Sequence, residues 1–433
     1  MNANNLLQPG TELNELKFDG FLDWFVCLTD PKIHWKYEPT YVLSQASFIL
    51  GGIITLIHAL IRGKRLPWLW IGAILHGMFV EILSYVAPDV NNFWHSQTPI
   101  IFFGRRFPLH IILLYACFIY SSAVAVAKLR LPKWSEPFAV GLAVVLIDIP
   151  FDIVSVKFVH WFWHDTDPNI ADRHYFVPWN SYYFHATFAA SFCFWFHFLK
   201  QKFCVSEGKW IQGNSFLMEL ITTILAAILG PIGGALLFVP IYDPLHNTYK
   251  IHSEVTFFIV FTIFLVLAWM GDRSPKSASK IKTHWTTFLL VSYLIIHYTL
   301  FWIIPVFFNP ENEISTGIKE QIGPCDEFEP LQTLSGKVLQ KRKYLCASDY
   351  DEKYFDWSCL PKQPKSGSLW YTSCGTPFEN RAEYITIISL ICFLAFAVFY
   401  QLHFNSWGDE VFSLEDNKKA EDEKKAKSTK KNK

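Results

Sequence analysis

The distribution of apolar residues along the chain predicts a helical membrane protein. Apolar runs of about 20 residues are long enough to cross a bilayer as helices. Nine such runs occur, at residues 41–61, 66–87, 107–127, 136–157, 180–200, 214–239, 254–271, 285–307 and 383–403. We therefore expect an all-α fold, a polytopic transmembrane bundle of about nine spans, with residues 41–307 forming an eight-span core.

The first 40 residues precede this core and form an N-terminal segment, 1–40. They lack the basic start, apolar centre and small-residue cleavage site of a signal peptide, so we expect the first span to direct its own insertion. Residues 18–28 are apolar but short, and they contain Asp19 and Asp23. This pattern is typical of a segment that lies at the membrane interface.

The basic residues between the predicted spans indicate an orientation, because cytosolic loops are richer in Lys and Arg. Alternate short loops contain Arg62, Lys64, Arg65, Lys128, Arg130, Lys133, Lys200, Lys202, Lys209, Arg273, Lys276, Lys280 and Lys282. The opposite short loops contain only Arg105, Arg106, Arg173 and Lys250. We therefore expect a lumenal or external N-terminus and a cytosolic C-terminus, which requires an odd number of spans.

A polar loop at residues 308–382 separates the last span, 383–403, from the others, and the orientation places it in the lumen. It contains Cys325, Cys346, Cys359 and Cys374. Four cysteines in an oxidising compartment favour two disulfides, with three possible pairings. A zinc site is the alternative, but the loop contains no CxxC pair, which argues against it.

The tail at residues 404–433 is charged and of low complexity, so we expect it to be disordered in the cytosol. Lys430 and Lys431 are fourth and third from its end. This spacing resembles the dilysine signal that coat machinery reads to retrieve membrane proteins to the endoplasmic reticulum. The alternative is a basic tail near an anionic leaflet. We favour retrieval, and hence the endoplasmic-reticulum membrane.

Ionisable residues within spans are expensive, roughly 2.5–3.5 kcal/mol each at the bilayer centre. Asp148 and Asp152 are four residues apart in the fourth span, so they share a helix face. Pro150 between them should free a backbone carbonyl. Two close carboxylates repel, so we expect one to hold a proton, which is the state that a general acid needs.

Other polar residues fall at the same depth, in the half of the bundle nearer the lumen: Glu81, His110, Asn180 and His185. Together they could build an acid/base site or a metal site, or they could bond one another to fix helix packing. For His58, His76, His197 and His297, each taken alone, we favour packing. For Asp148 with Asp152 we favour function. Glu219, near the cytosolic end of the sixth span, is expected at the interface.

The metal interpretation is weak, because no HxxxH or HExxH motif occurs on a span. His160 and His164 would share a helix face only if the fourth span continued that far, with Asp165 or Asp167 beside them. We therefore predict no metal and no cofactor.

Composition agrees with the membrane assignment, since 51% of the residues are hydrophobic and 17% aromatic. Only 18% are charged, and 38 basic residues balance 38 acidic ones. A net charge of zero excludes a nucleic-acid binder of the simple basic kind.

Part of the chain, about residues 75–190, also resembles a known family. The matching elements follow in order: Glu81, the segment FGRRFPLHIILLYA at 103–116, Asp148 with Asp152, Trp161 with Trp163, and YFVPWN ending in Asn180. They are similar to those of the carotenoid-biosynthesis membrane proteins that include bacterioruberin-type hydratases. Ile153 and Phe176 depart from that pattern, which has Pro and Gly there. The resemblance implies acid-catalysed addition of water to an isoprenoid double bond.

The leading hypothesis is therefore an enzyme that acts on a lipid or isoprenoid substrate in a lumen-side acidic cavity. Asp148 and Asp152 would be the acid/base pair, with Glu81, Asn180 and His185 as supporting groups. The alternative is a non-enzymatic protein, either a transporter or a scaffold whose lumenal loop binds a protein partner. The charges within the spans cluster near one side, which counts against a transporter, because a transporter needs a polar path to both faces.

Overall fold

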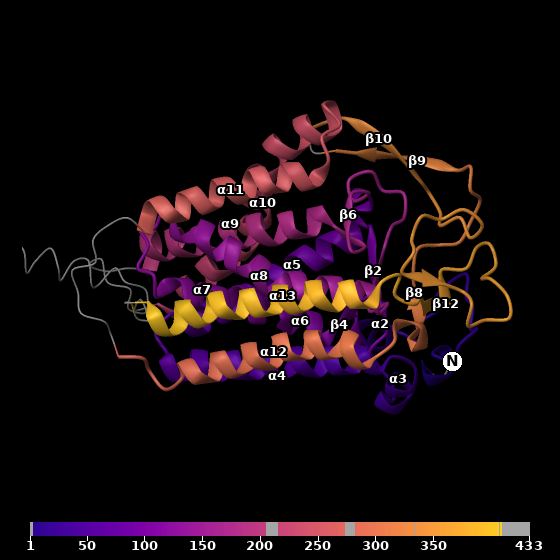
Figure 1. The fold of residues 1–433 in the computed structure, drawn as a ribbon, viewed down its shortest axis with the longest axis horizontal. Helices are drawn as coiled ribbons and strands as arrows, with labels where there is room; N and C mark the ends of the chain where they lie inside the picture. The colour runs from indigo at the N-terminus through magenta and orange to yellow at the C-terminus, as the bar shows by residue number, and fades with distance from the viewer. Residues whose placement is uncertain (1–2, 205–214, 273–281, 334, 407, 409–433) are drawn as a thin grey trace, which may run out of the picture.

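The structure is a computed structural model that describes residues 3–204, 215–272, 282–333, 335–406 and 408. Long helices run side by side along the molecule (Figure 1). They are α4 (Pro39–Arg62), α5 (Leu66–Val86), α8 (Glu136–Lys157), α9 (Trp179–Cys204), α10 (Phe216–Tyr242), α11 (Ser253–Asp272), α12 (Thr287–Phe307) and α13 (Arg381–Tyr400). A further rod is continuous from α6 (Leu109–Tyr115) through one π-helical turn, η2 (Ala116–Tyr120), to α7 (Ser121–Ala127).

Eight helices among the described residues are long and apolar enough to cross a membrane, which confirms a multi-pass membrane protein. The predicted span at 180–200 coincides with α9, a helix of 26 residues that packs against α8 and α10. Its polar residues, among them His197 and Lys200, make α9 less hydrophobic than the eight. The ninth crossing therefore stays a prediction.

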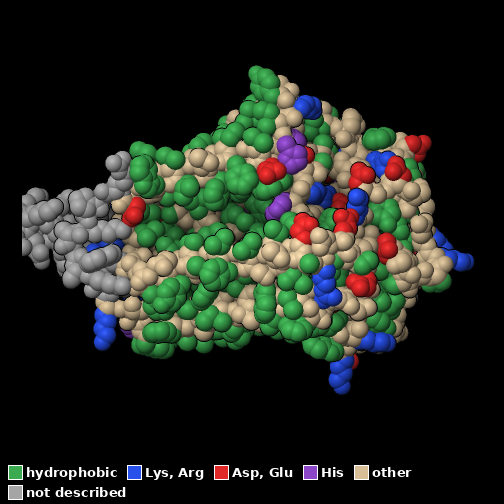
Figure 2. Space-filling model, viewed as in Figure 1, with side chains coloured by type: hydrophobic (Ala, Val, Ile, Leu, Met, Phe, Trp, Pro, Cys, Tyr) green, Lys and Arg blue, Asp and Glu red, His purple; other side chains and the backbone are tan. Residues whose placement is uncertain are grey.

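Hydrophobic side chains cover the bundle on the face shown in Figure 2, whereas most charged side chains there gather at one end. Large apolar residues are exposed along several helices, for example Leu60, Leu236, Trp269 and Phe393. Such a continuous apolar surface would be unusual on a protein surrounded by water. It is the surface that a helix bundle needs in lipid.

The charged end of the molecule is a cap that we define as residues 3–38, 88–108, 158–178 and 308–380. It contains short strands, so the fold is mostly helical rather than all-α. One antiparallel sheet has the order β11 (Phe355–Asp356), β12 (Trp370–Gly375), β8 (Ile314–Ile318), and a second has the order β1 (Val26–Leu28), β3 (Ile100–Phe102), β4 (Phe107–Pro108). Two-stranded pairs join β9 (Phe328–Gln332) to β10 (Val338–Arg342), β2 (Phe93–His95) to β5 (Trp161–Trp163), and β6 (Arg173–His174) to β7 (Val177–Pro178).

The two predicted disulfides are present in the cap, as Cys325–Cys346 and Cys359–Cys374. The loop that they brace does not stand alone. Trp370 pairs with Leu13 in a β-bridge, and its indole Nε1 donates to the backbone oxygen of Leu6 over 3.0 Å. The four-cysteine loop and the N-terminal segment therefore form one structural unit over the end of the bundle.

The segment expected at the interface, residues 18–28, forms α2 (Phe21–Phe25) and β1 at the edge of the cap. Phe21 and Leu22 are 69% and 74% exposed. Two neighbouring apolar side chains with this exposure suit a segment that contacts the membrane surface, and that contact stays a prediction.

The N-terminus and the four-cysteine loop lie at the cap end, whereas α13 runs to the opposite end (Figure 1). Lys209, Arg273, Lys276 and Lys280 lie outside the described residues, as do Lys430 and Lys431. The described residues of the predicted cytosolic loops, such as Arg62 and Lys128, follow helix ends that point away from the cap. The arrangement is compatible with the predicted orientation.

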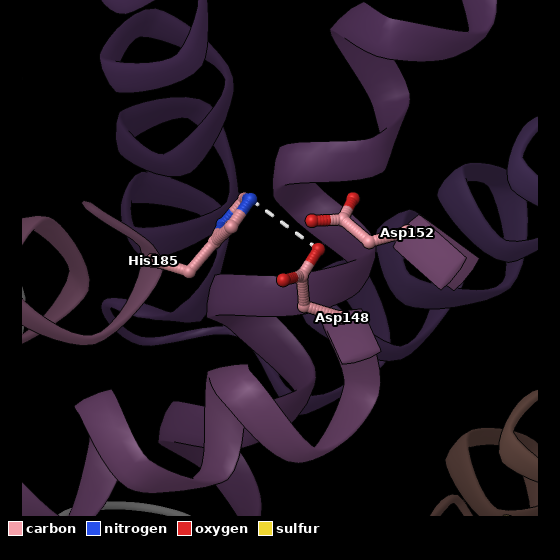
Figure 3. Close-up of side chains that lie close together, drawn as sticks. All are labelled: Asp148, Asp152 and His185. Carbon is pink, nitrogen blue, oxygen red and sulfur yellow. Dashed lines mark ion pairs between the residues drawn. The ribbon is translucent and has the colours of Figure 1, made fainter. Parts of the chain in front are cut away.

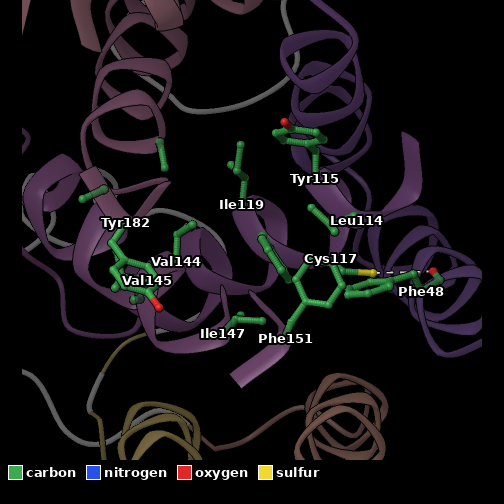
Figure 4. Packing of buried hydrophobic residues seen from close by; sticks show 14 of the residues in the cluster. Phe48, Leu114, Tyr115, Cys117, Ile119, Val144, Val145, Ile147, Phe151 and Tyr182 are labelled. Atoms are coloured by element: carbon green, nitrogen blue, oxygen red, sulfur yellow. Dashed lines mark hydrogen bonds between the residues drawn. The ribbon is translucent and has the colours of Figure 1, made fainter. Parts of the chain in front are cut away.

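Helix α8 lies in the middle of the bundle, and most of its residues are buried. Phe151 of α8 packs edge-to-face against Phe48 of α4, with ring centroids 4.8 Å apart (Figure 4). It packs in the same way against Phe118 of η2, with ring centroids 5.9 Å apart. This central position explains why the two aspartates of α8 are removed from both lipid and water.

Candidate active site

Pro150 shapes the part of α8 that holds the two aspartates. A proline has no N–H, so the carbonyl of Leu146, four residues earlier, loses its helical partner. Tyr298 of α12 donates its hydroxyl to that carbonyl over 3.1 Å, and His297 bonds the neighbouring carbonyl of Ile147 over 2.9 Å. The freed carbonyl that the sequence predicts therefore exists, and α12 satisfies it.

Asp148, Asp152 and His185 come together at this point, one helix contributing both acids and α9 the histidine (Figure 3). His185 Nε2 lies 3.3 Å from Asp148 Oδ1, and Ser181 Oγ donates to Asp152 Oδ2 over 2.7 Å. One N or O atom from each member of the trio lies within 4.8 Å of the others. Asp148 and Asp152 are 0% and 1% exposed.

The two oxygens of Asp148 receive no hydrogen bond from an N–H or hydroxyl donor of the described residues. Instead, its carboxyl group shares a hydrogen bond with that of Asp152, and its Oδ1 lies near the ring of His185. Buried polar groups in folded proteins are nearly always paired. The negative charge of the pair must therefore be compensated, either by a proton held between the carboxyl groups or by a bound cation.

A cavity of about 110 Å³ lies beside this cluster, between α5, α6, α8 and α9 and under β2 and β5 of the cap. Most of its wall is apolar or aromatic. Its polar and titratable lining consists of His76, Glu81, His95, Tyr115, Asp152, Trp161, Trp163, Ser181 and His185. The described lining residues include no Lys or Arg. Two of the predicted acids, Glu81 and Asp152, thus line one mostly apolar cavity, and Asp148 lies beside it.

Glu81 contributes a second carboxylate to the cavity wall from α5. Tyr85 and Tyr115 each donate a hydroxyl to it over 2.9 Å, and His95 Nε2 lies 3.5 Å away. Gly77 makes this possible, because a Cβ at that position would lie 2.1 Å from the Tyr115 ring. Glu81 is thus held by two phenols, in a fixed orientation that suits a proton acceptor.

Asn180 does not join the cluster. Its Nδ2 donates to the backbone oxygen of Asn169, and it does not line the cavity. The cause is helical geometry, because consecutive residues point about 100° apart and Ser181 takes the cavity position instead. Ser181 was missed, although its spacing of four from His185 places both on one face of α9. His110 is buried beside the Tyr41 ring, with ring centroids 5.2 Å apart, and does not line the cavity either.

The segment after α8 does not continue as a helix, since α8 ends at Lys157 and β5 follows. His160 and His164 therefore do not share a helix face. His160 Nε2 lies 2.9 Å from Thr40 Oγ1, whereas His164 Nε2 faces Glu320 Oε1 over 2.8 Å in the cap. The metal pair that would need a longer helix is absent from the described structure.

The histidine and acids of the cap form a separate group with perturbed protonation. Burial and the nearby charge of Glu320 raise the pKa of Asp165 to about 7. Burial alone would lower the pKa of His164, but the carboxylate of Glu320 raises it through charge and hydrogen bonding. The positive side chains of Lys341 and Arg342 act on this group.

Glu219 is not at an interface, contrary to the prediction. It is fully buried, with Lys200 Nζ 2.7 Å and Arg65 Nε 3.2 Å from its carboxylate oxygens. This buried ion triad joins α5, α9 and α10 at the end of the bundle away from the cavity. His58 and His297 have packing partners, Tyr120 and the Ile147 carbonyl.

A family model described as Domain of unknown function (DUF7802) matches residues 13–404, which include the bundle, the cavity and both disulfides. The chain belongs to the DUF7802 family. No curated protein and no solved structure matches the chain at a significant level. The DUF7802 match covers the cap and the bundle as one region, in agreement with their close packing, and it assigns no activity.

Within the DUF7802 region, two groups of described residues have the composition and spacing to hold a metal ion. One is Asp148 with Asp152 and His185 in the bundle, and the other is His164 with Asp165 and Glu320 in the cap. The second group already has basic neighbours. In addition, His164 Nδ1 accepts the backbone N–H of Thr166, so the ring proton of neutral His164 sits on Nε2, facing Glu320.

Proposed function

We propose that this protein is a membrane enzyme that performs acid/base chemistry on a lipid or isoprenoid whose reacting section enters the cavity. The observation that carries the proposal is the state of Asp148. It is fully buried, its carboxyl group is hydrogen-bonded to that of Asp152, and it faces His185 next to a mostly apolar cavity. Perturbed carboxylates in such a cleft are the usual mark of acid/base catalysis.

Packing alone explains the cluster poorly. A polar group that fixes helix packing does so by being fully paired, as Tyr298 is with Leu146. Two carboxylates each cost roughly 2.5–3.5 kcal/mol to insert near the bilayer centre. Two carboxyl groups that meet one histidine, with no Lys or Arg among the described residues of the cavity wall, are an expensive way to fix packing.

The cavity contains the groups that addition of water to a double bond requires. An acid at the Asp148–Asp152 cluster donates a proton to one alkene carbon, and the oxygen of a water molecule bonds to the other carbon. The proton that this water releases passes to a carboxylate, for which Glu81 is oriented. Alkene and water are consumed and an alcohol forms, with no change of oxidation state overall.

The aromatic wall suits such a reaction. The faces of Trp161 and Trp163, which line the cavity, can stabilise a developing carbocation. The indole N–H groups of both have no partner among the described residues, so they can bind water or a substrate oxygen. The cavity is smaller than the roughly 300–1,000 Å³ of sites that enclose whole small molecules. Only the reacting section of a longer chain would therefore enter it.

The same proposal includes the location, a multi-pass protein of the endoplasmic-reticulum membrane with a lumenal N-terminus and a cytosolic C-terminus. Two disulfides in the cap suit an oxidising lumen. The basic residues at the other end suit the cytosol. The proposed location also includes retrieval to the endoplasmic reticulum by coat machinery that binds Lys430 and Lys431.

A specific observation keeps the scaffold alternative open. A second pocket, of about 590 Å³, lies in the cap. Basic and acidic side chains both line it, including Arg106, Lys319, Glu320 and Lys341. A mixed, partly apolar hollow of this size would suit a lumenal protein partner. The buried triad of Arg65, Lys200 and Glu219 counts against a transporter, because the charged residues described at that end pair with one another and are not among the cavity lining.

The test compares the lipids of cells that lack the protein with cells that express it or its variants. Cells that express wild type should contain a lipid whose mass is about 18 units higher than that of its precursor, because one water has been added. Cells that express Asp148→Asn should lack this product. Glu136→Gln is the matched control, because Glu136 is a buried carboxyl of the same helix that faces His197 outside the cavity. Unchanged lipids in cells that lack the protein, or full rescue by Asp148→Asn, would refute the enzyme.

A further inference from the structure

The cluster on α8 and α9 combines two carboxyl groups with one histidine. Asp148, Asp152 and the third acid, Glu81, all lie on or beside the cavity, and no Lys or Arg is among its described lining residues. Among the described residues, His185 lies beside Asp148 and His95 beside Glu81, and the charge of Arg106 also acts on Glu81 from outside the cavity lining. The cap group differs, since Lys341 and Arg342 act on it.

The distance between His185 and Asp148 also suits two ligands of one metal ion. His185 Nε2 lies 3.3 Å from Asp148 Oδ1, without the alignment of a hydrogen bond. Charge-assisted N–H···O bonds are shorter, about 2.7–2.9 Å. In a tetrahedral site with bonds of about 2.0–2.1 Å, neighbouring ligand atoms lie about 3.3 Å apart. The observed spacing therefore leaves room for an ion between the two side chains.

The surroundings supply the other parts of a metal site. Ser181 donates to Oδ2 of Asp152, which fixes that carboxylate as outer-shell hydrogen bonds do. Both oxygens of Asp148 are buried and receive no N–H or hydroxyl donor of the described residues; their neighbours are the other two members of the trio, Asp152 and His185. The adjoining cavity offers space for water at a fourth position. One imidazole and two carboxylates suit Zn²⁺ and similar divalent ions.

We propose that Asp148, Asp152 and His185 bind one divalent metal ion of the zinc class in the membrane-embedded half of the bundle nearest the cap. The proposal takes its site from the proposed function and deepens it. A water bound to the ion would hold the acidic proton that the carboxyl pair would otherwise hold. Metal binding itself does not depend on which lipid, if any, is the substrate.

The experiment measures metal in the full-length chain, expressed with added zinc, purified in detergent and passed over a chelating resin. Elemental analysis should find about one zinc per chain in wild type and less than about 0.1 in Asp148→Asn and His185→Gln. Glu136→Gln should keep the ion. So should Glu81→Gln, which changes the cavity without removing a ligand. Cobalt in place of zinc should give the visible absorption bands of a tetrahedral site, and His185→Gln should abolish them.

The outcomes separate this site from its rivals. Zinc that is lost in Glu320→Gln but kept in Asp148→Asn would move the ion to the cap and overturn the proposal. Wild type without metal, at normal yield and with a single peak in size-exclusion chromatography, would also overturn it. If that metal-free protein still converts the lipid, the proposed function stands, with a carboxyl group of the Asp148–Asp152 pair as the acid. Bound zinc with unchanged cellular lipids would instead refute the enzyme and leave the metal site standing.

Discussion

The bond between Tyr298 and the carbonyl freed by Pro150 gives a prediction that can be worked through quantitatively. Tyr298 donates to Leu146 O over 3.1 Å in a part-buried position. A hydrogen bond of this kind is worth about 1 kcal/mol net, and leaving the carbonyl unpaired adds a cost of similar size. Bonds between membrane helices average about 0.6 kcal/mol and reach about 1.7. Tyr298→Phe should therefore lower the free energy of unfolding by about 1–1.5 kcal/mol.

The free-energy cost of Tyr298→Phe depends on the proline at position 150. In Pro150→Ala the new N–H at position 150 can bond Leu146 O within the helix, so removing the Tyr298 hydroxyl should then cost much less. The coupling between the two substitutions is expected at about 1 kcal/mol. Tyr384→Phe is the control, because Tyr384 donates to Ile153 O of the same helix, a carbonyl that Pro150 does not free. Its cost should be the same with proline or alanine at position 150.

The assay is equilibrium unfolding of the full chain in mixed detergent, followed by helical circular dichroism, for wild type, the single variants and both double variants. If Tyr298→Phe costs equally in the two backgrounds, the hydroxyl does not replace the helical bond that the proline removes. If Tyr384→Phe couples to Pro150→Ala as strongly, the effect is a general shift of α8 and the reasoning fails.

Three further predictions concern the rest of the molecule. Peptide mapping without reduction should find Cys325 joined to Cys346 and Cys359 to Cys374, and replacing the second pair by serine should cost about 2–5 kcal/mol; crossed pairings would contradict the cap structure. Glu219→Gln should destabilise the bundle by about 3–5 kcal/mol, because it removes the carboxylate charge that Lys200 and Arg65 share. Asp349→Asn, in the exposed pair with Arg342, should change stability by less than about 1 kcal/mol in the same detergent titration. The pKa of Asp165 is raised to about 7 in the folded cap, so between about pH 4 and pH 7 the folded state holds more protons than the unfolded one. Thermal stability should therefore fall as the pH rises from about 4 to about 7. Asp165→Asn should flatten that slope, and an unchanged slope would show that Asp165 is not its cause.

The long apolar runs and the spacing of four between Asp148 and Asp152 were enough to predict the bundle and the centre of the site. Both signals are local, since a span is about 20 consecutive residues and a helix face repeats within one turn. The same rule would have found Ser181 from His185, and Tyr85 from Glu81. Applying it to Asn180 failed because depth in the membrane does not fix the direction of a side chain around the helix.

The remaining site residues come from contacts that no local pattern encodes. Tyr115 reaches Glu81 from another helix, 34 positions away, and His95 reaches it from a strand of the cap. The strands themselves are two to six residues long, too short for an alternating pattern to distinguish them from loop. Whether the chain crosses nine times, how it is oriented and whether it resembles a hydratase in chemistry stay predictions.

The bundle contains two groups of buried charged residues, and their pairing suggests a structural role for one and a chemical role for the other. At the end away from the cap, Glu219 has two cations at 2.7 and 3.2 Å, so its carboxylate is paired with basic side chains from other parts of the bundle. Near the cap, Asp148 and Asp152 meet a single histidine beside a cavity, although the same helices could equally have placed a lysine there. Among the described residues, the acid at the first end is paired with lysine and arginine, whereas the acids near the cap lie beside a cavity whose lining has neither. Replacing Asp148 should therefore affect chemistry or metal content more than stability, and replacing Glu219 should do the reverse.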